Sequence, residues 1–434
     1  MTRPIRPMRI LVITPNLPWP LNSGGAAAQF STLKCLAEDH DFVVAAPLHE
    51  PRQVEHLRQL EAALPNVRFV GVPVWWQPEG PPRNPFFRLA RGLRHLVPER
   101  PARQAPAASS LYYPFNPQPN SFLKAVVAEL KKGVDVCQME FAEMMSLGCW
   151  LPPAIPRIFI HHQIHFVYAR RFIEAQGDPS GHAHYLAAMM EVQELAYLKY
   201  YNAIVTFSRE DRDAVQSRLP GTNIIVSPFP APADLNDAGE IAAAFSGHFC
   251  FVALGAHNPN RDALEWLLAE IWPQITAKLP SASLHVIGEW SEADQAAFTR
   301  PGVVFRGFVK ELSAALRGGI MLVPLRVGSG LRVKILAALT LGVPVVTTTI
   351  GAEGLLVEAG TEMLVANAAA EFAQAAVKLA TEPALWPAMA RAGREAVKRN
   401  YSPATVRAQR NLIYEALVSK KSVANGAVET KLVS

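Results

Sequence analysis

Short apolar runs, each about the length of one strand, alternate along the chain with longer stretches of mixed polarity. In the first half these runs predict strands at Met8–Thr14, Phe42–Ala46, Val67–Val72, Val134–Met139, Arg157–His161, Ala203–Phe207 and Asn223–Ser227. The stretches between them include helix-like segments at Ala26–Glu38 and Asn120–Lys132. Continuous apolar strands separated by helices are typical of a parallel sheet that is covered on both faces.

A proline-rich connector follows at Ser227–Pro232, where each proline restricts its own backbone and that of its predecessor. A second series then begins, with strands at His248–Leu254, Ser283–Ile287, Val303–Arg306, Gly319–Pro324 and Pro344–Thr348, and helices at Arg261–Ala277, Arg332–Leu341 and Ala369–Ala380. We therefore predict an α/β fold of two doubly wound Rossmann-like domains, residues 1–228 and 229–400. Ligands are expected in the cleft between them, at the carboxyl ends of the strands.

Length and composition agree with two hydrophobic cores. The chain has 434 residues, of which 50% are hydrophobic and 18% are charged. No run of roughly 18 uncharged apolar residues is present, so no membrane-spanning helix is predicted. The N-terminus does not have the pattern of a signal peptide, and the expected location is the cytoplasm. Residues 419–434 lack periodicity, which predicts a disordered tail.

The cysteines and the net charge narrow the function classes only partly. Cys35, Cys137, Cys149 and Cys250 form no close pair and lie in apolar surroundings, which favours buried free thiols, with zinc or catalytic roles as alternatives. The net charge of +5 suits anionic partners such as nucleotide phosphates, anionic lipids or nucleic acid. Nucleic acid is not expected as a partner, because no pattern of interleaved aromatic and basic stacking residues is present.

The segment Phe86–Arg103 interleaves five arginines with apolar residues. Such a pattern is typical of a short basic helix at a membrane surface, and equally of a solvated helix packed on its domain. Peripheral contact with the inner membrane face therefore stays open.

Three loops carry candidate anion-binding chemistry. Gly24 and Gly25 precede the first helix, where the backbone can approach a ligand and free amides can meet an anion. Arg261 stands in the first turn of the helix after the strand His248–Leu254, which suits a phosphate contact. The alternative is that Asn260 caps this helix and that Arg261 is solvated.

The strongest candidate is the Gly328-Ser329-Gly330 turn, which follows a predicted strand and leads into a helix with Arg332 and Lys334 near its start. A helix dipole disfavours cations in the first turn, so two of them indicate a bound anion such as a diphosphate. A surface basic cluster is the alternative. Glu353 follows the strand Pro344–Thr348, where a carboxylate can bind sugar or ribose hydroxyls.

These motifs occur in a recognisable order. Gly-x-His-x-Pro-Asn-x-Asp-Ala at Gly255–Ala263 includes His257 and Asn260, and is followed by Gly307-Phe308-Val309. Pro-Leu-Arg-x-Gly-Ser-Gly-Leu-Arg-x-Lys at Pro324–Lys334 includes Arg326, and Gly-Val-Pro-Val-Val-Thr-Thr and Gly-Ala-Glu-Gly come after it. The series resembles the bacterial group 1 glycosyltransferases, glycosyltransferase family 4, with the GT-B fold. The likeness covers roughly residues 8–415 and is specific in the second half.

The resemblance implies sugar transfer from a nucleoside-diphosphate sugar to a glycan or lipid-linked acceptor, with retention and with neither metal nor cofactor. It implies that Phe308 and Val309 meet the base, and that the diphosphate is held by cations matching Arg261 or the pair Arg332 and Lys334. A histidine that faces the donor sugar is best matched by His162, with His161 and His165 as rivals. Residues 401–418 match a helix that crosses back to the first domain.

One departure from the family keeps alternatives open. Two glutamates eight positions apart are usual around the glycine-rich turn, but Ser329 and Ala337 stand there. Losing a carboxylate that binds the ribose hydroxyls costs on the order of 1–3 kcal/mol. Glu353 could substitute, the donor could be unusual, or the protein could be a decayed transferase that only binds nucleotide sugars. A sugar-nucleotide epimerase is a third reading.

Overall fold

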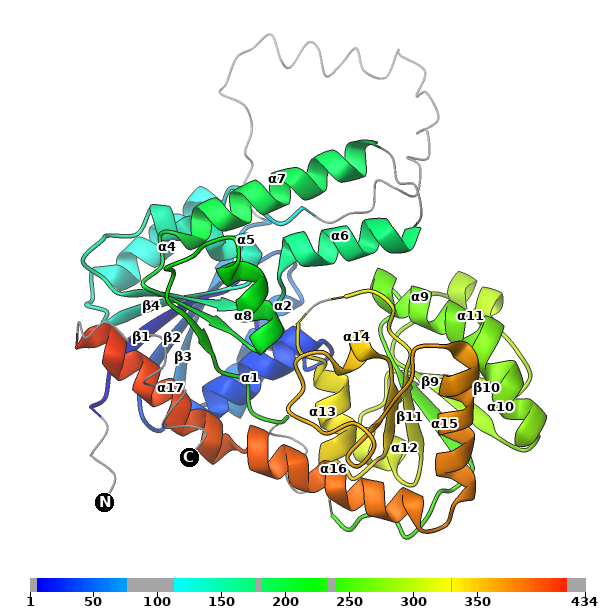
Figure 1. Cartoon of the computed structure of the whole chain (residues 1–434). Helices are drawn as coiled ribbons and strands as arrows, with labels where there is room; N and C mark the ends of the chain where they lie inside the picture. Colours follow the sequence, from blue (N-terminus) through cyan, green and yellow to red (C-terminus); the bar gives the residue numbers. More distant parts are fainter. Residues whose placement is uncertain (1–5, 76–112, 177–180, 233–238, 329, 420–434) are drawn as a thin grey trace.

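The computed structural model describes residues 6–75, 113–176, 181–232, 239–328 and 330–419. The segment Phe86–Arg103, Ser329 and residues 420–434 of the predicted tail lie outside these described residues. The described part forms two domains, each with a parallel sheet and helices on its faces (Figure 1). This confirms the predicted α/β fold of two Rossmann-like domains.

The first sheet has the strand order β3-β2-β1-β4-β5-β6-β7, and all neighbours are parallel. Its strands are β1 (Arg9–Ile13), β2 (Asp41–Leu48), β3 (Val67–Pro73), β4 (Val136–Glu140), β5 (Arg157–His161), β6 (Ala203–Thr206) and β7 (Ile224–Val226). The connecting helices are α1 (Gly24–Leu36), α2 (Gln53–Ala63), α4 (Asn120–Leu130), α5 (Ala142–Met145), η3 (Ser146–Cys149), α6 (His165–Gln176), α7 (Gly181–Leu198) and α8 (Arg209–Gln216).

The second sheet has the order β10-β9-β8-β11-β12-β13 and is also parallel. Its strands are β8 (His248–Val252), β9 (Ser283–Ile287), β10 (Val303–Gly307), β11 (Ile320–Val323), β12 (Val345–Thr347) and β13 (Leu364–Val365). Its helices are α9 (Asn258–Trp266), the π-helix η5 (Leu267–Ile271), α10 (Trp272–Lys278), α11 (Glu292–Phe298), α12 (Leu312–Leu316), α13 (Val333–Thr340), α14 (Thr349–Ala352), α15 (Ala369–Thr381) and α16 (Leu385–Tyr401).

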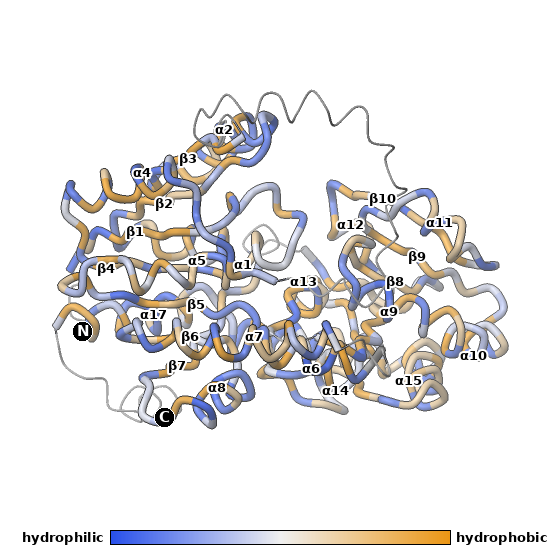
Figure 2. The backbone as a smooth tube through the Cα atoms, turned by 90° about the horizontal axis from the view of Figure 1, so that it is seen from above, coloured by the Kyte–Doolittle hydropathy of each residue, from blue (hydrophilic) through white to orange (hydrophobic). Residues whose placement is uncertain are grey.

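The hydrophobic core continues from one domain into the other. Residues of β1 and β2 belong to the same buried cluster as residues of β8, β11 and α13. Coloured by hydropathy, the central strands are largely hydrophobic while the helices carry a mixture (Figure 2). Strands that are buried on both faces need apolar residues on both, which explains the continuous runs in the sequence.

The last helix, α17 (Pro403–Val418), lies against the first domain (Figure 1). The Arg407 guanidinium pairs with the Asp39 carboxylate, and the buried Tyr414 hydroxyl donates to Gln138 Oε1 at 2.6 Å. The connector after β7 meets the end of α16, where the Ala231 amide donates to the Tyr401 carbonyl. The chain therefore crosses between the domains twice, once in the connector after β7 and once between α16 and α17.

All of the predicted strands are present, with ends that move by at most two residues, and β13 was not predicted. The prediction of four buried thiols is wrong in part. Cys137 and Cys250 are buried, but Cys35 is half-buried and Cys149 is exposed. Cys149 ends the short helix η3, whose buried positions are taken by Leu147 and Gly148.

Candidate active site between the domains

Two helix N-termini from different domains lie close together, those of α1 and α13. Ser23 caps α1 by accepting from the Ala26 amide at 3.2 Å. A side chain at Gly24 would lie 3.2 Å from Val333, the first residue of α13, so glycine allows the two helices to come this close. Each helix start carries partial positive charge and free amides, and together they form a region that favours an anion.

Lys334 adds a full charge beside these helix starts. Its Nζ donates to the Asn260 amide oxygen at 2.9 Å and lies 5.7 Å from the centre of the Phe251 ring. No carboxylate among the described residues forms an ion pair with it. Burial and the neighbouring Arg332 lower the pKa of Lys334 to about 7. The site therefore holds a desolvated amine whose charged form a bound anion would stabilise.

Asn260 fixes the position of that ammonium. Its side-chain amide donates to the Leu254 carbonyl at 3.0 Å, which directs its oxygen at Lys334. The alternative prediction, that Asn260 caps the helix, is wrong: α9 begins at Asn258 and its capping residue is His257. Desolvation of the His257 imidazole by the surrounding protein, together with the charges of Lys334 and Arg332, lowers its pKa to about 4. The imidazole is therefore neutral at pH 7.

Arg332 folds back over the glycine-rich turn. It is 9% exposed and donates to the carbonyls of Gly330 and Ile350. A side chain at Gly328 would lie 2.9 Å from its guanidinium, and Gly328 and Gly330 both have positive φ angles, of 140° and 79°. Burial lowers the pKa of Arg332 to about 10, so the guanidinium stays charged at neutral pH. Arg332 thus stabilises the turn through its hydrogen bond to Gly330, and it remains positively charged.

Arg261 and Arg326, two other predicted cations, each have a carboxylate partner. Arg261 pairs with Asp294 and lies over the Phe298 ring. Arg326 donates to both oxygens of Asp262, at 3.1 and 2.6 Å. Their charges are already compensated, whereas that of Lys334 is not.

Glu353, predicted to bind hydroxyls, is held by a residue that the sequence did not single out. Both of its carboxylate oxygens accept from Arg171 of α6, at 2.5 and 2.7 Å. Nothing in the sequence distinguishes Arg171 from its neighbour Arg170, so no local pattern could have identified it. Ala337, which stands where the family usually has its second glutamate, is buried in α13.

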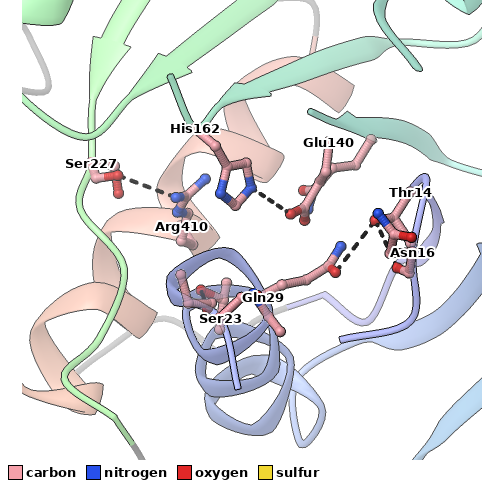
Figure 3. A network of polar contacts seen from close by, with 12 residues as sticks. Thr14, Asn16, Ser23, Gln29, Glu140, His162, Ser227 and Arg410 are labelled. Atoms are coloured by element: carbon pink, nitrogen blue, oxygen red, sulfur yellow. Dashed lines mark hydrogen bonds and ion pairs between the residues drawn. The ribbon is translucent and has the colours of Figure 1, made fainter. Parts of the chain in front are cut away.

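His162 lies in a polar network of the first domain (Figure 3). Its Nε2 is 2.9 Å from Glu140 Oε2, and Glu140 in turn accepts from Gln138 at 2.6 Å. The imidazole stacks on Phe141, with ring centres 3.8 Å apart, and is only 9% exposed. It lines a small cavity together with Gln29, Glu140 and Arg410. The imidazole of His162 therefore contacts the interior of the first domain, while its backbone carbonyl reaches the glycine-rich turn.

The rival histidines have a structural partner in Glu194. His161 lies 2.9 Å from this carboxylate, and both side chains are completely buried. Glu194 also accepts the backbone amides of His165 and Phe166, at 3.0 and 2.9 Å, and so satisfies the start of α6.

The remaining predicted residues are Gly25, Phe308 and Val309. Gly25 packs against the Phe141 ring, since a side chain there would lie 2.8 Å from it. Phe308 follows β10 and is 59% exposed, which leaves its ring accessible for stacking, and Val309 is half-buried beside it. Among the described residues, no helix has the length and apolarity needed to cross a membrane, and no group of three or more His, Cys, Asp or Glu is placed to hold a metal ion.

Comparison with protein-family models gives a match within the domain that carries the glycine-rich turn. Residues 248–382 match the family model described as "Glycosyl transferases group 1". A search of curated protein sequences gave no match.

Solved structures match nearly the whole chain. A TarM variant from S. aureus, crystallised with fondaparinux, alpha-GlcNAc-glycerol and UDP, has a TM-score of 0.65 at 12% identity, covering 95% of this chain and 99% of its own. Sucrose-phosphate synthase from Thermosynechococcus elongatus has a TM-score of 0.65 at 17% identity, and the match covers 95% of this chain and 100% of the synthase. HepE from Anabaena, in complex with UDP-glucose, has a TM-score of 0.59 at 13% identity, and the match covers 95% of this chain and 100% of HepE. These similarities show that the chain has the GT-B fold.

Proposed function

We propose that this protein is a metal-independent, retaining glycosyltransferase that moves a sugar from a nucleoside-diphosphate sugar to a glycan or lipid-linked acceptor. The family match of residues 248–382 and the GT-B fold support sugar transfer. Cell-surface polysaccharide or lipopolysaccharide synthesis is the process in which such an acceptor is expected. The observation that carries the proposal is Lys334, an ammonium without a carboxylate partner among the described residues, beside two helix N-termini.

The donor diphosphate would lie over the adjacent starts of α1 and α13. Negative charge develops on this group as the sugar leaves, and Lys334, Arg332 and the helix amides would stabilise it. Positive groups in a site shielded from water stabilise developing negative charge more than the same groups would in bulk water. Phe308 would cover the base. His162, which directly follows strand β5, would lie near the donor sugar.

Two measurements test the proposal. A thermal-shift screen against UDP, ADP, GDP and dTDP identifies the nucleotide, since a ligand that binds the folded state raises the melting temperature. Lys334→Ala is then compared with Lys278→Ala, which removes an exposed lysine of α10. We expect the first substitution to weaken nucleotide binding and lower transfer by about tenfold or more, as for loss of a charge-assisted contact, and the second to change neither. Unchanged binding and turnover in Lys334→Ala would refute the proposal.

A second candidate is a decayed transferase that binds nucleotide sugars without turning them over. It is favoured by Ala337, which leaves α13 without the expected carboxylate, and by the engagement of Glu353 with Arg171. Nucleotide binding with no release of nucleotide from any sugar donor, over a panel of glycan and lipid-linked acceptors, would support this candidate. Release of nucleotide without an acceptor would instead indicate an epimerase.

A further inference from the structure

Arg171 is the side chain through which the first domain holds the glycine-rich turn of the second. Its guanidinium donates to the Gly328 carbonyl at 2.7 Å as well as to the two oxygens of Glu353. The side chains of Arg171 and Glu353 are 27% and 22% exposed, so the pair is partly shielded from solvent. A planar guanidinium that makes two parallel bonds to a carboxylate fixes orientation as well as distance.

The backbone on both sides is shaped for this contact. A side chain at Gly330 would lie 2.4 Å from the His162 carbonyl oxygen, and one at Gly354 would lie 2.4 Å from Ser208. Both glycines also have positive φ angles, of 79° and 77°. Gly330 and the segment after α14 therefore pack directly against the first domain.

The helix that carries Arg171 is firmly placed. Glu194 satisfies two backbone amides at the start of α6, and Phe166, Ala169 and Phe172 are buried on its inner face. Arg170, the preceding residue, points to another partner within the same domain, because it pairs with Glu191 of α7 at 2.5 Å. Only the second arginine of this pair reaches the other domain.

We propose that Arg171 is a positioning residue for the diphosphate, and this rests on the proposed function. It holds the Gly328 carbonyl and Glu353 from the opposite domain, so Arg332 and the start of α13 reach the geometry that binds the diphosphate only when the domains are closed. Nucleotide affinity and domain closure are thereby linked through one side chain that does not itself have to touch the nucleotide.

The test compares Arg171→Ala with Arg170→Ala, since each removes one arginine and one ion pair from the same helix. The affinity for the nucleoside diphosphate selected by thermal shift is measured by titration calorimetry, and the melting temperature of each variant is recorded. We expect Arg171→Ala to weaken binding by about tenfold or more, as for loss of charge-assisted hydrogen bonds, while Arg170→Ala binds like wild type. Arg171→Lys keeps the charge but not the two-pronged geometry, and it should recover only part of the loss.

Equal affinity in the two alanine variants would overturn the inference, and so would full recovery by lysine, because charge alone would then suffice. Small-angle scattering of the nucleotide-free protein distinguishes a failure of the inference about Arg171 from a failure of the proposed function. If wild type binds no nucleoside diphosphate, the proposed function fails. A larger radius of gyration for Arg171→Ala than for Arg170→Ala then still supports a domain link through Arg171, and equal radii refute it.

Discussion

The affinity for a nucleoside diphosphate should fall steeply as the pH rises above 7, and Lys334→Met should remove this dependence. The pKa of Lys334 is about 7 in the free protein, because burial and Arg332 disfavour its charged form. A bound diphosphate favours the charged form and raises that pKa toward its usual value, so binding takes up a proton. The affinity is therefore fully present below pH 7 and is lost as the pH rises.

The expected loss of affinity can be calculated from the pKa of Lys334 in the free protein. Each pH unit above the pKa lowers the affinity up to tenfold, so the loss from pH 7 to pH 9 approaches about 50-fold. The other groups of the site stay constant over this range. Arg332 remains charged because its pKa is about 10, and His257 remains neutral because its pKa is about 4. The terminal phosphate of the ligand titrates near pH 6, roughly one unit below the window.

Titration calorimetry from pH 7 to 9, in two buffers with different ionisation enthalpies, measures both the affinity and the number of protons taken up. Wild type should lose affinity across the window and take up close to one proton per nucleotide at its alkaline end. Lys334→Met should bind weakly at every pH and take up none. A flat profile in wild type, or the same slope in the variant, would show that Lys334 does not meet the diphosphate.

Three further predictions concern packing and access. Gly330→Ala should destabilise the protein and weaken nucleotide binding more than Gly221→Ala, because both glycines have positive φ but only Gly330 lies against another backbone; urea unfolding and calorimetry compare them. Tyr414→Phe should lower the free energy of unfolding by about 1–3 kcal/mol, since it leaves the buried Gln138 oxygen without its donor, and an unchanged urea midpoint would contradict this. Cys149 should react with a thiol reagent in the native protein, as judged by mass spectrometry of digested samples, whereas protection of this residue would contradict its exposure.

The fold was predictable because its signal is local. Buried parallel strands need apolar residues on both faces, and helices separate them, so each run of the sequence marks one strand. The strand β13 escaped because two residues, Leu364 and Val365, are too few to form a pattern. The start of α9 was placed three residues late, since Asn258 and Pro259 precede the polar residues that mark its first turn.

The candidate site was predictable only where its residues are contiguous. The glycine-rich turn and its cations lie within one short segment, so their chemistry could be inferred together. Which cations are compensated depends on partners far along the chain. Asp262 lies 64 residues from Arg326, and Glu353 lies 182 residues from Arg171. No local pattern encodes such pairs, because the first forms only when the second domain folds and the other only when the two domains come together.

A crystal structure of the protein with the nucleoside diphosphate selected by thermal shift tests the central claim most directly. The account predicts that the diphosphate lies over the adjacent starts of α1 and α13, with Lys334 Nζ turned from Asn260 to a phosphate oxygen at about 2.7–2.9 Å. A nucleotide bound away from these helix starts, with Lys334 still donating to Asn260, would contradict it.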